Sequence, residues 1–245
     1  MSGAVGFVAA MRLTLRVVVR QLLTRGRALA LVLLGGFLVL LSFAFGRSDN
    51  VDEPIEDGVR LIDLAGFTLV VPIVALVFAA ASLGDLREDR TLVYLWLRPM
   101  GRAPVVIGAW LASIGVSLLF TLPTLVLSGV LLDAGSDVVI GAATATGVGV
   151  IAYSALFLLL GLLVKNSVIW GVGYVLMWEG LIAQFGTATA RVAVRGYTRS
   201  ILASITDVEL DLGELSLAGG LIGATVITVV ALGLAVVRLQ SMEID

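Results

Sequence analysis

The residue best placed to do chemistry is Glu179, a lone acid within the apolar stretch GYVLMWEGLIAQF. It stands about eleven residues into a predicted membrane-crossing helix, roughly 16 Å from the inner end of that helix and near the middle of a bilayer. A charge at that depth costs at least about 2.5–3.5 kcal/mol, so the side chain must be protonated, paired or in contact with water. Trp178 and Gln184 lie on the same stretch and are candidates for the same site.

Two interpretations of Glu179 remain open. In the first, the carboxyl group lies on a substrate path, with Trp178 and Gln184 beside it. In the second, it is structural, and either holds its helix against a neighbour or caps a helix break at Gly180 by accepting hydrogen bonds from freed backbone amides.

Most other chemistry is excluded by composition. The chain has no Cys and no His, so it has no disulfide, thiolate nucleophile, imidazole metal ligand or histidine general base. The sole lysine, Lys165, stands between Val164 and Asn166 and cannot belong to a phosphate-binding loop, which needs Gly-Lys followed by Ser or Thr. We therefore expect no catalytic residue, no metal site and no cofactor bound by this chain. The net charge of -2 also argues against a nucleic-acid partner.

A second candidate site is the predicted inner loop at residues 85–104, DLREDRTLVYLWLRPMGRAP. Acidic and basic residues alternate at its start, and aromatic residues follow. Arginines alone would suffice to orient the chain in a membrane, whereas mixed charges beside aromatics favour docking of a soluble partner. The loop is predicted to form a short amphipathic helix at the inner surface.

The elements that position these residues are predicted to be membrane spans. Hydrophobic residues make up 59% of the chain and charged residues 14%, against roughly 45–50% and 25% in soluble domains. We predict an all-α polytopic membrane protein. Residues 28–245 form one transmembrane domain, and its six spans cover about 28–45, 64–84, 105–132, 138–164, 168–188 and 217–237. Residues 181–216 are too polar to cross, and we expect one or two short outer helices there that could re-enter the bilayer.

Charge placement orients these spans with both termini in the cytoplasm. Most Lys and Arg residues fall on the inner side, as the positive-inside rule requires, whereas Arg191, Arg195 and Arg199 run against it. Residues 1–27 carry Arg12, Arg16 and Arg20 at four-residue spacing beside apolar positions, which predicts an amphipathic helix in the membrane plane. That helix either orients the first span or touches a cytoplasmic partner.

Small residues recur at helix-packing spacing in two predicted spans. Gly141, Ala145 and Gly149 stand on the fourth span, and Gly219 and Gly223 on the sixth. Such stripes let helix backbones approach closely, and we expect them to mark packing within one subunit.

The stretch LREDRTLVYLWLRPMGRAPVVIGAWLAS resembles the signature of ABC-2 type transporter permeases, the membrane subunits of ATP-binding-cassette exporters. The signature has an acidic residue, Thr-Leu, a later Leu, a Pro, an Arg and then a span. Its counterparts here are Glu88, Thr91, Leu92, Leu97, Pro99 and Arg102. The runs WEGLIAQ and VRGYTRS are also similar to bacterial members, notably actinobacterial ones.

The resemblance implies a permease in the bacterial plasma membrane that exports an amphipathic or lipid-like substrate. Two permease chains, as a homodimer or a heterodimer with a related permease, would form the path among membrane lipids, lined by spans two and five. Two copies of a separate ABC ATPase, which holds the ATP and Mg, would dock on a coupling helix in residues 85–104. The docking residues implied are Asp85, Arg87, Glu88, Asp89, Arg90, Thr91, Tyr94, Trp96, Arg98 and Arg102. A membrane scaffold or sensor and an ion-coupled secondary carrier are the alternatives.

Overall fold

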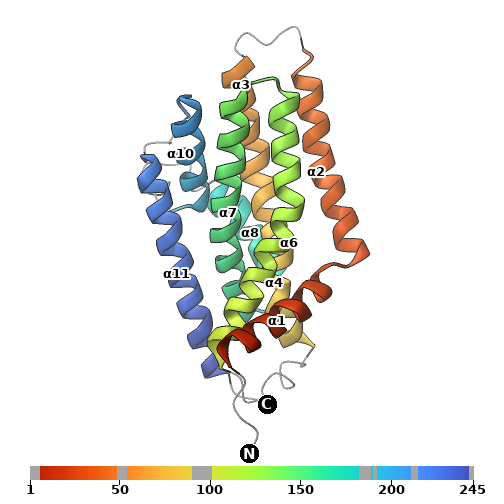
Figure 1. The fold of residues 1–245 in the computed structure, drawn as a ribbon, viewed down its shortest axis with the longest axis vertical. Helices are drawn as coiled ribbons and strands as arrows, with labels where there is room; N and C mark the ends of the chain where they lie inside the picture. Colours follow the sequence, from red (N-terminus) through yellow and green to blue (C-terminus); the bar gives the residue numbers. More distant parts are fainter. Residues whose placement is uncertain are drawn as a thin grey trace, which may run out of the picture.

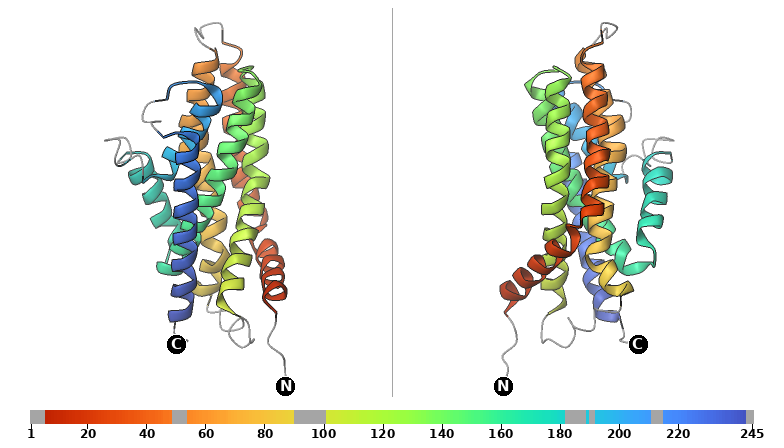
Figure 2. Two further views of the ribbon diagram at one scale, coloured as in Figure 1. Left: turned by 60° about the vertical axis from the view of Figure 1, so that its left-hand side comes forward. Right: turned by 90° about the vertical axis from the view of Figure 1, so that its right-hand side faces the viewer.

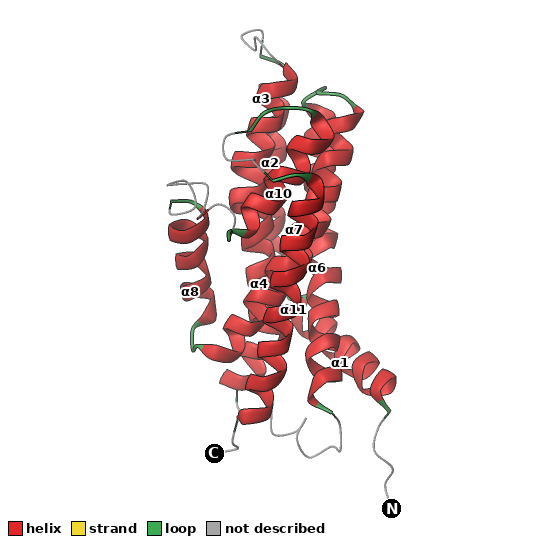
Figure 3. Cartoon of the chain, turned by 90° about the vertical axis from the view of Figure 1, so that its left-hand side faces the viewer, coloured by secondary structure: helices red, strands yellow, loops and turns green. Residues whose placement is uncertain are grey.

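The structure is a computed structural model that describes residues 6–48, 54–89, 101–181, 189, 192–210 and 215–242. All regular structure in these ranges is helical, which confirms the predicted all-α class (Figure 3). The elements in chain order are α1 (Phe7–Leu22), α2 (Arg25–Phe45), α3 (Pro54–Leu61), η1 (Ile62–Val70), α4 (Val71–Glu88), α6 (Arg102–Leu131), α7 (Ser136–Leu163), α8 (Ser167–Gly173), η2 (Tyr174–Glu179), α10 (Val194–Thr206) and α11 (Leu217–Ser241).

Five helices in the described part of the chain are long and apolar enough to cross a membrane. They are α2, the continuous rod α3–η1–α4, α6, α7 and α11, and they match the predicted spans 28–45, 64–84, 105–132, 138–164 and 217–237. The remaining predicted span, 168–188, begins as α8 and η2, which end at Glu179. Residues 182–188 lie outside the described residues, so the count of six spans is not confirmed.

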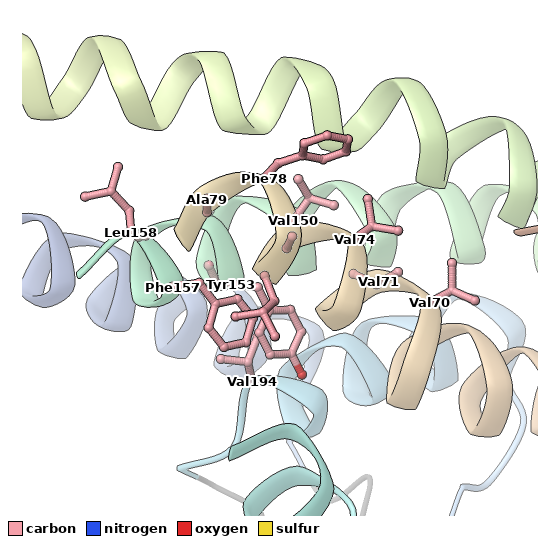
Figure 4. Close-up of a cluster of buried hydrophobic side chains, with 14 of the residues drawn as sticks. Val70, Val71, Val74, Phe78, Ala79, Val150, Tyr153, Phe157, Leu158 and Val194 are labelled. Atoms are coloured by element: carbon pink, nitrogen blue, oxygen red, sulfur yellow. The ribbon is translucent and has the colours of Figure 1, made fainter. Parts of the chain in front are cut away.

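The helices α4 and α7 form the centre of the bundle, and α2 and α11 lie at its periphery (Figure 1). A methyl group on Gly161 of α7 would come within 2.4 Å of the Ala80 carbonyl oxygen of α4, so the two backbones almost touch. Large buried side chains lie on two sides of α4 (Figure 4). Phe78 packs against Phe120 of α6, and Tyr153 of α7 stacks on Phe157.

Two further elements pack on the outside of these five helices. The helix α1 crosses the foot of the bundle obliquely, at the end where α11 also finishes (Figures 1 and 2). The α8–η2 segment rises beside the bundle (Figure 2). It touches the bundle at Gly171, where a methyl group would lie 2.1 Å from the Leu76 side chain of α4, and at Tyr174, whose ring packs edge-on against Phe157 of α7. Large apolar side chains on this segment are exposed, among them Ile169, Trp170, Leu176 and Met177.

The segments η1 and η2 are π-helical, with backbone hydrogen bonds to the fifth preceding residue. The Gly180 amide, for example, donates to the Val175 carbonyl at 2.9 Å. The π turn is wider than the α turn and is often found at functional sites. Each π segment carries one buried acid, Asp63 on η1 and Glu179 at the end of η2.

Candidate functional site

Both acids bond to α10, a short helix that packs into the half of the bundle away from the two chain termini (Figure 1). Small residues make room for it. A methyl group on Gly149 of α7 would lie 2.8 Å from the Thr198 side chain, and one on Gly223 of α11 would lie 2.4 Å from the Tyr197 ring. The small-residue stripes therefore mark packing within the subunit, as predicted, and both receive α10.

One detail of that prediction was wrong. Gly219 lies near only Leu215 and Ser216 of its own turn. The close contact belongs instead to Gly220, where a methyl group would lie 3.0 Å from the Tyr197 carbonyl oxygen. The two glycines of α11 that contact α10 are therefore Gly220 and Gly223, three residues apart instead of four.

Asp63 holds the side of α10 through two arginines. Its carboxylate accepts a hydrogen bond from Arg195 Nη2 at 2.9 Å and from Arg199 Nε at 3.1 Å. Arg195 and Arg199 are four residues apart on one helix, so they share one face and reach the same acid. Asp63 and Arg195 are each only 4% exposed. The two guanidinium groups that ran against the positive-inside rule are therefore paired inside the protein.

Glu179 holds the N-terminal end of α10. Its Oε1 atom accepts hydrogen bonds from the Tyr174 hydroxyl at 2.8 Å and the Val194 amide at 3.1 Å, and Oε2 accepts one from the Arg195 amide at 3.0 Å. Val194 and Arg195 are the first two residues of α10, whose amides have no partner within their own helix. A negative group at a helix N-terminus also interacts favourably with the helix dipole.

These contacts are the kind that the structural interpretation of Glu179 described, but the cap is at a different place. The sequence suggested a break at Gly180, whereas the capped amides belong to a helix that begins fourteen residues later, at Val194. Glu179 is fully buried and does not face open space in the described structure. In this arrangement two acids and two arginines balance in formal charge around α10.

An apolar groove of about 460 Å³ runs beside this cluster, between η2, α7 and α11. Trp178 is half-buried on its wall, and Tyr174 joins the groove to Glu179 because its ring lines the groove and its hydroxyl donates to the acid. The lining residues are Leu156, Leu159, Tyr174, Trp178, Val192, Val226, Ile227, Val230, Ala231 and Leu234. In the described part of the chain, no group of three or more acids is arranged to hold a metal ion.

At the opposite end of α8, charged residues from the start of the predicted inner loop contact their own chain. Asp85 pairs with Arg27 at 2.7 Å, next to the joint between α1 and α2. Glu88 accepts a hydrogen bond from the Asn166 amide at 2.9 Å, in the turn between α7 and α8. The end of α4 is therefore bonded to the chain near the start of α2 and just before the start of α8.

The family comparison bears on this arrangement. The sequence model described as ABC-2 family transporter protein matches residues 37–178, more than half of the chain. The chain belongs to the ABC-2 transporter family. It is accordingly a multi-pass membrane permease of an ABC transporter, a transport component whose ATPase is a separate subunit. No curated protein matches the chain.

The matched stretch of this permease begins within α2 and ends at Trp178, one residue before Glu179. It contains Asp63 and the inner loop but not α10 or α11. The cluster around α10 thus joins the matched part of the chain to the part beyond it.

Several residues predicted to dock the ATPase lie outside the described residues, and Gln184 does as well. The docking residues concerned are Arg90, Thr91, Tyr94, Trp96 and Arg98. Of the others, Asp89 is exposed at the end of α4, Arg102 is half-buried as the first residue of α6, and Arg87 Nη1 approaches the Gly161 carbonyl oxygen at 3.5 Å. Their docking role stays a prediction.

Asp63 is the site residue that sequence reasoning missed. It stands between Ile62 and Leu64, directly before the predicted second span. A usable signal was present, because a single acid at the edge of an apolar run complements two arginines at four-residue spacing.

Proposed function

We propose that this ABC-2 permease exports an amphipathic or lipid-like substrate across the bacterial plasma membrane. It pairs with a second permease chain, a copy of itself or a close relative, and binds two ABC ATPase subunits at the cytoplasmic end, where both termini lie. The observation that carries the proposal is the apolar groove between η2, α7 and α11.

The groove suits a molecule with a hydrocarbon part. Its wall is almost wholly apolar, and one of its lining residues, Tyr174, donates its hydroxyl to Glu179. Apolar ligands are held by such surfaces, and a few placed polar groups fix their orientation. An amphipathic molecule can enter from the bilayer with its chain along Val226 and Val230 and its polar end toward Tyr174.

The α8–η2 segment supports a route from the ATPase to this groove. Its thirteen helical residues span about 20 Å at 1.5 Å per residue. Glu88 holds its lower end through the Asn166 amide, and Glu179 at its upper end caps α10. A displacement of the inner loop would move this segment, widen or narrow the groove, and pull on α10 at the same time.

The exposed apolar face of α8–η2 supports pairing with a second permease chain. Ile169, Trp170 and Met177 are each between 63% and 70% exposed. A second chain against this face would place two grooves on either side of one interface.

The first test is co-purification of the tagged full-length chain with an ATP-binding-cassette ATPase. The recovered complex is then reconstituted in liposomes and assayed for ATP-dependent movement of a fluorescent short-chain phospholipid and a cationic amphipathic dye. Recovery of no nucleotide-binding protein would overturn the proposal. Movement driven by an ion gradient without ATP would indicate an ion-coupled carrier instead.

Matched variants test the groove and the route. Leu234→Trp fills the groove and should lower transport several-fold while ATPase binding is kept, whereas Val237→Trp, on α11 but outside the lining, should not. Glu88→Ala should leave ATP hydrolysis intact but uncouple it from transport. Its control is Lys165→Ala, an exposed charged residue in the same α7–α8 turn that is outside the predicted docking set. Equal effects within either pair would refute the assigned role. Loss of the ATPase from Glu88→Ala would mean that Glu88 docks the partner directly.

A further inference from the structure

The helix α1 carries a row of arginines that has no counter-charge in the described structure. Arg12, Arg16 and Arg20 are all exposed, and none forms an ion pair with another described residue. The first 48 residues of the sequence contain neither Asp nor Glu. The row therefore needs an anionic partner from outside this part of the chain.

The geometry of α1 turns this row away from the bundle. The buried face consists of Ala10, Thr14, Val18 and Leu22. Each arginine from Arg12 to Arg20 lies two positions after a buried residue, which is about 200° around a helix. The buried face packs tightly on α6, because a methyl group on Gly108 would come within 2.6 Å of the Met11 carbonyl oxygen.

The level of α1 is fixed by its connection to the first span. The helix ends at Leu22, and the membrane-crossing α2 begins at Arg25. With only two residues between them, α1 must lie where the chain enters the bilayer, and Figure 2 shows it lying across the foot of the bundle. Leu13 and Val17, 37% and 51% exposed, flank the arginines on this helix.

We propose that α1 is a binding surface for anionic phospholipids, whose phosphate groups are held by Arg12, Arg16 and Arg20. Guanidinium groups bind phosphate oxygens through paired hydrogen bonds. A basic row with exposed apolar residues beside it at the bilayer boundary is suited to headgroups and the adjoining acyl chains together. An acidic protein surface would satisfy the arginines but would leave Leu13 and Val17 uncovered. The inference does not depend on the proposed transport function.

The absence of cysteine allows a local measurement on the full-length chain. A single Leu13→Cys variant is labelled with an environment-sensitive fluorophore and placed in vesicles that contain brominated phosphatidylglycerol or brominated phosphatidylcholine, which quench the label on contact. Val229→Cys on α11, where the native side chain is 63% exposed, reports on lipid far from the arginines.

We expect phosphatidylglycerol to be favoured at least fivefold at Leu13→Cys, about the effect of one arginine near an anionic surface, and not at Val229→Cys. Substituting Gln for Arg12, Arg16 and Arg20 together should bring the ratio close to one, and Arg47→Gln, at the other end of α2, should leave it unchanged. Salt at 0.5 M should lower the wild-type ratio.

Two results would overturn the proposal. The first is a wild-type ratio near one, and the second is a ratio that survives the triple substitution. If the wild-type ratio is near one and the triple substitution releases a partner ATPase, the row belongs to a protein surface instead. Because quenching is read on folded protein in the bilayer, a variant that fails to fold is recognised by its loss of quenching by both lipids.

Discussion

Asp63→Asn would leave Arg195 and Arg199 without the carboxylate that they share. The side chains of Asp63 and Arg195 are 6% and 5% exposed, so water screens their interaction little. Removing one partner of a buried ion pair typically costs about 3–5 kcal/mol, mostly because a charge is left buried and uncompensated. We expect a loss of this size in the free energy of unfolding, measured by tryptophan fluorescence of the full-length chain during thermal unfolding in detergent micelles.

The matched control is Glu56→Gln on α3, the same kind of change on the same rod of helix. Glu56 pairs with Arg60, whose side chain is 60% exposed, and exposed pairs contribute about 0.3–0.5 kcal/mol. The stability lost in Asp63→Asn should therefore exceed that in the control several-fold.

A double-mutant cycle tests whether the cost comes from the unpaired arginines. Arg199→Gln leaves the pair of Asp63 and Arg195 in place, so it should lower the free energy of unfolding less than Asp63→Asn does. Adding it to Asp63→Asn leaves one uncompensated guanidinium where there were two, and the combined cost should fall below the sum by about 0.5–3 kcal/mol. Additive effects, or an Asp63→Asn protein that unfolds at the wild-type midpoint, would refute the buried cluster.

Three further changes test other contacts, each by the same unfolding measurement. Glu179→Gln replaces one acceptor oxygen with an NH2 group, which cannot accept a hydrogen bond from the Tyr174 hydroxyl or the α10 amides. The free energy of unfolding should fall by about 1–3 kcal/mol, and an unchanged value would contradict the cap on α10. Gly161→Ala should lower the free energy of unfolding by about 1–3 kcal/mol, because the added methyl group meets the Ala80 carbonyl. Gly147→Ala is the control, because the space around Gly147 is open. Similar losses of stability in the two variants would contradict the close packing of α4 and α7. Asn166, at φ 53°, should tolerate Gly but lose about 1–2 kcal/mol as Val, and a harmless Val would argue against the left-handed turn that presents its amide to Glu88.

Apolar runs predicted most of the fold because a bilayer admits few alternatives. Five of the expected spans coincide with long helices to within a few residues at most ends. The exception is the start of the second span, which the structure places at Ile55 instead of residue 64. Asp63 ended the apolar run early in the sequence, but its pairing with two arginines lets the helix continue past it.

The site was predicted less completely because its partners are distant or belong to the backbone. The position of Glu179 deep in an apolar stretch predicted that its carboxyl group is protonated, paired or in contact with water. Two of its three hydrogen-bond donors among the described residues are the backbone amides of Val194 and Arg195, which residue type does not reveal. The polarity of α10 suggested a surface helix, since a sequence does not show that Asp63, 132 positions away from Arg195, cancels its charge.

The two acids also limit how α10 can move. Asp63 belongs to the rod that continues into α4, and Glu179 ends the segment that begins at the α7–α8 turn. A shift of α10 relative to η1 would separate a buried ion pair, and a shift relative to η2 would uncover the amides at its N-terminal end. Both cost free energy, so motion is least costly where η1, η2 and α10 move together. The exposed side of α8–η2 is then where the bundle can change shape, and the groove adjoins this segment.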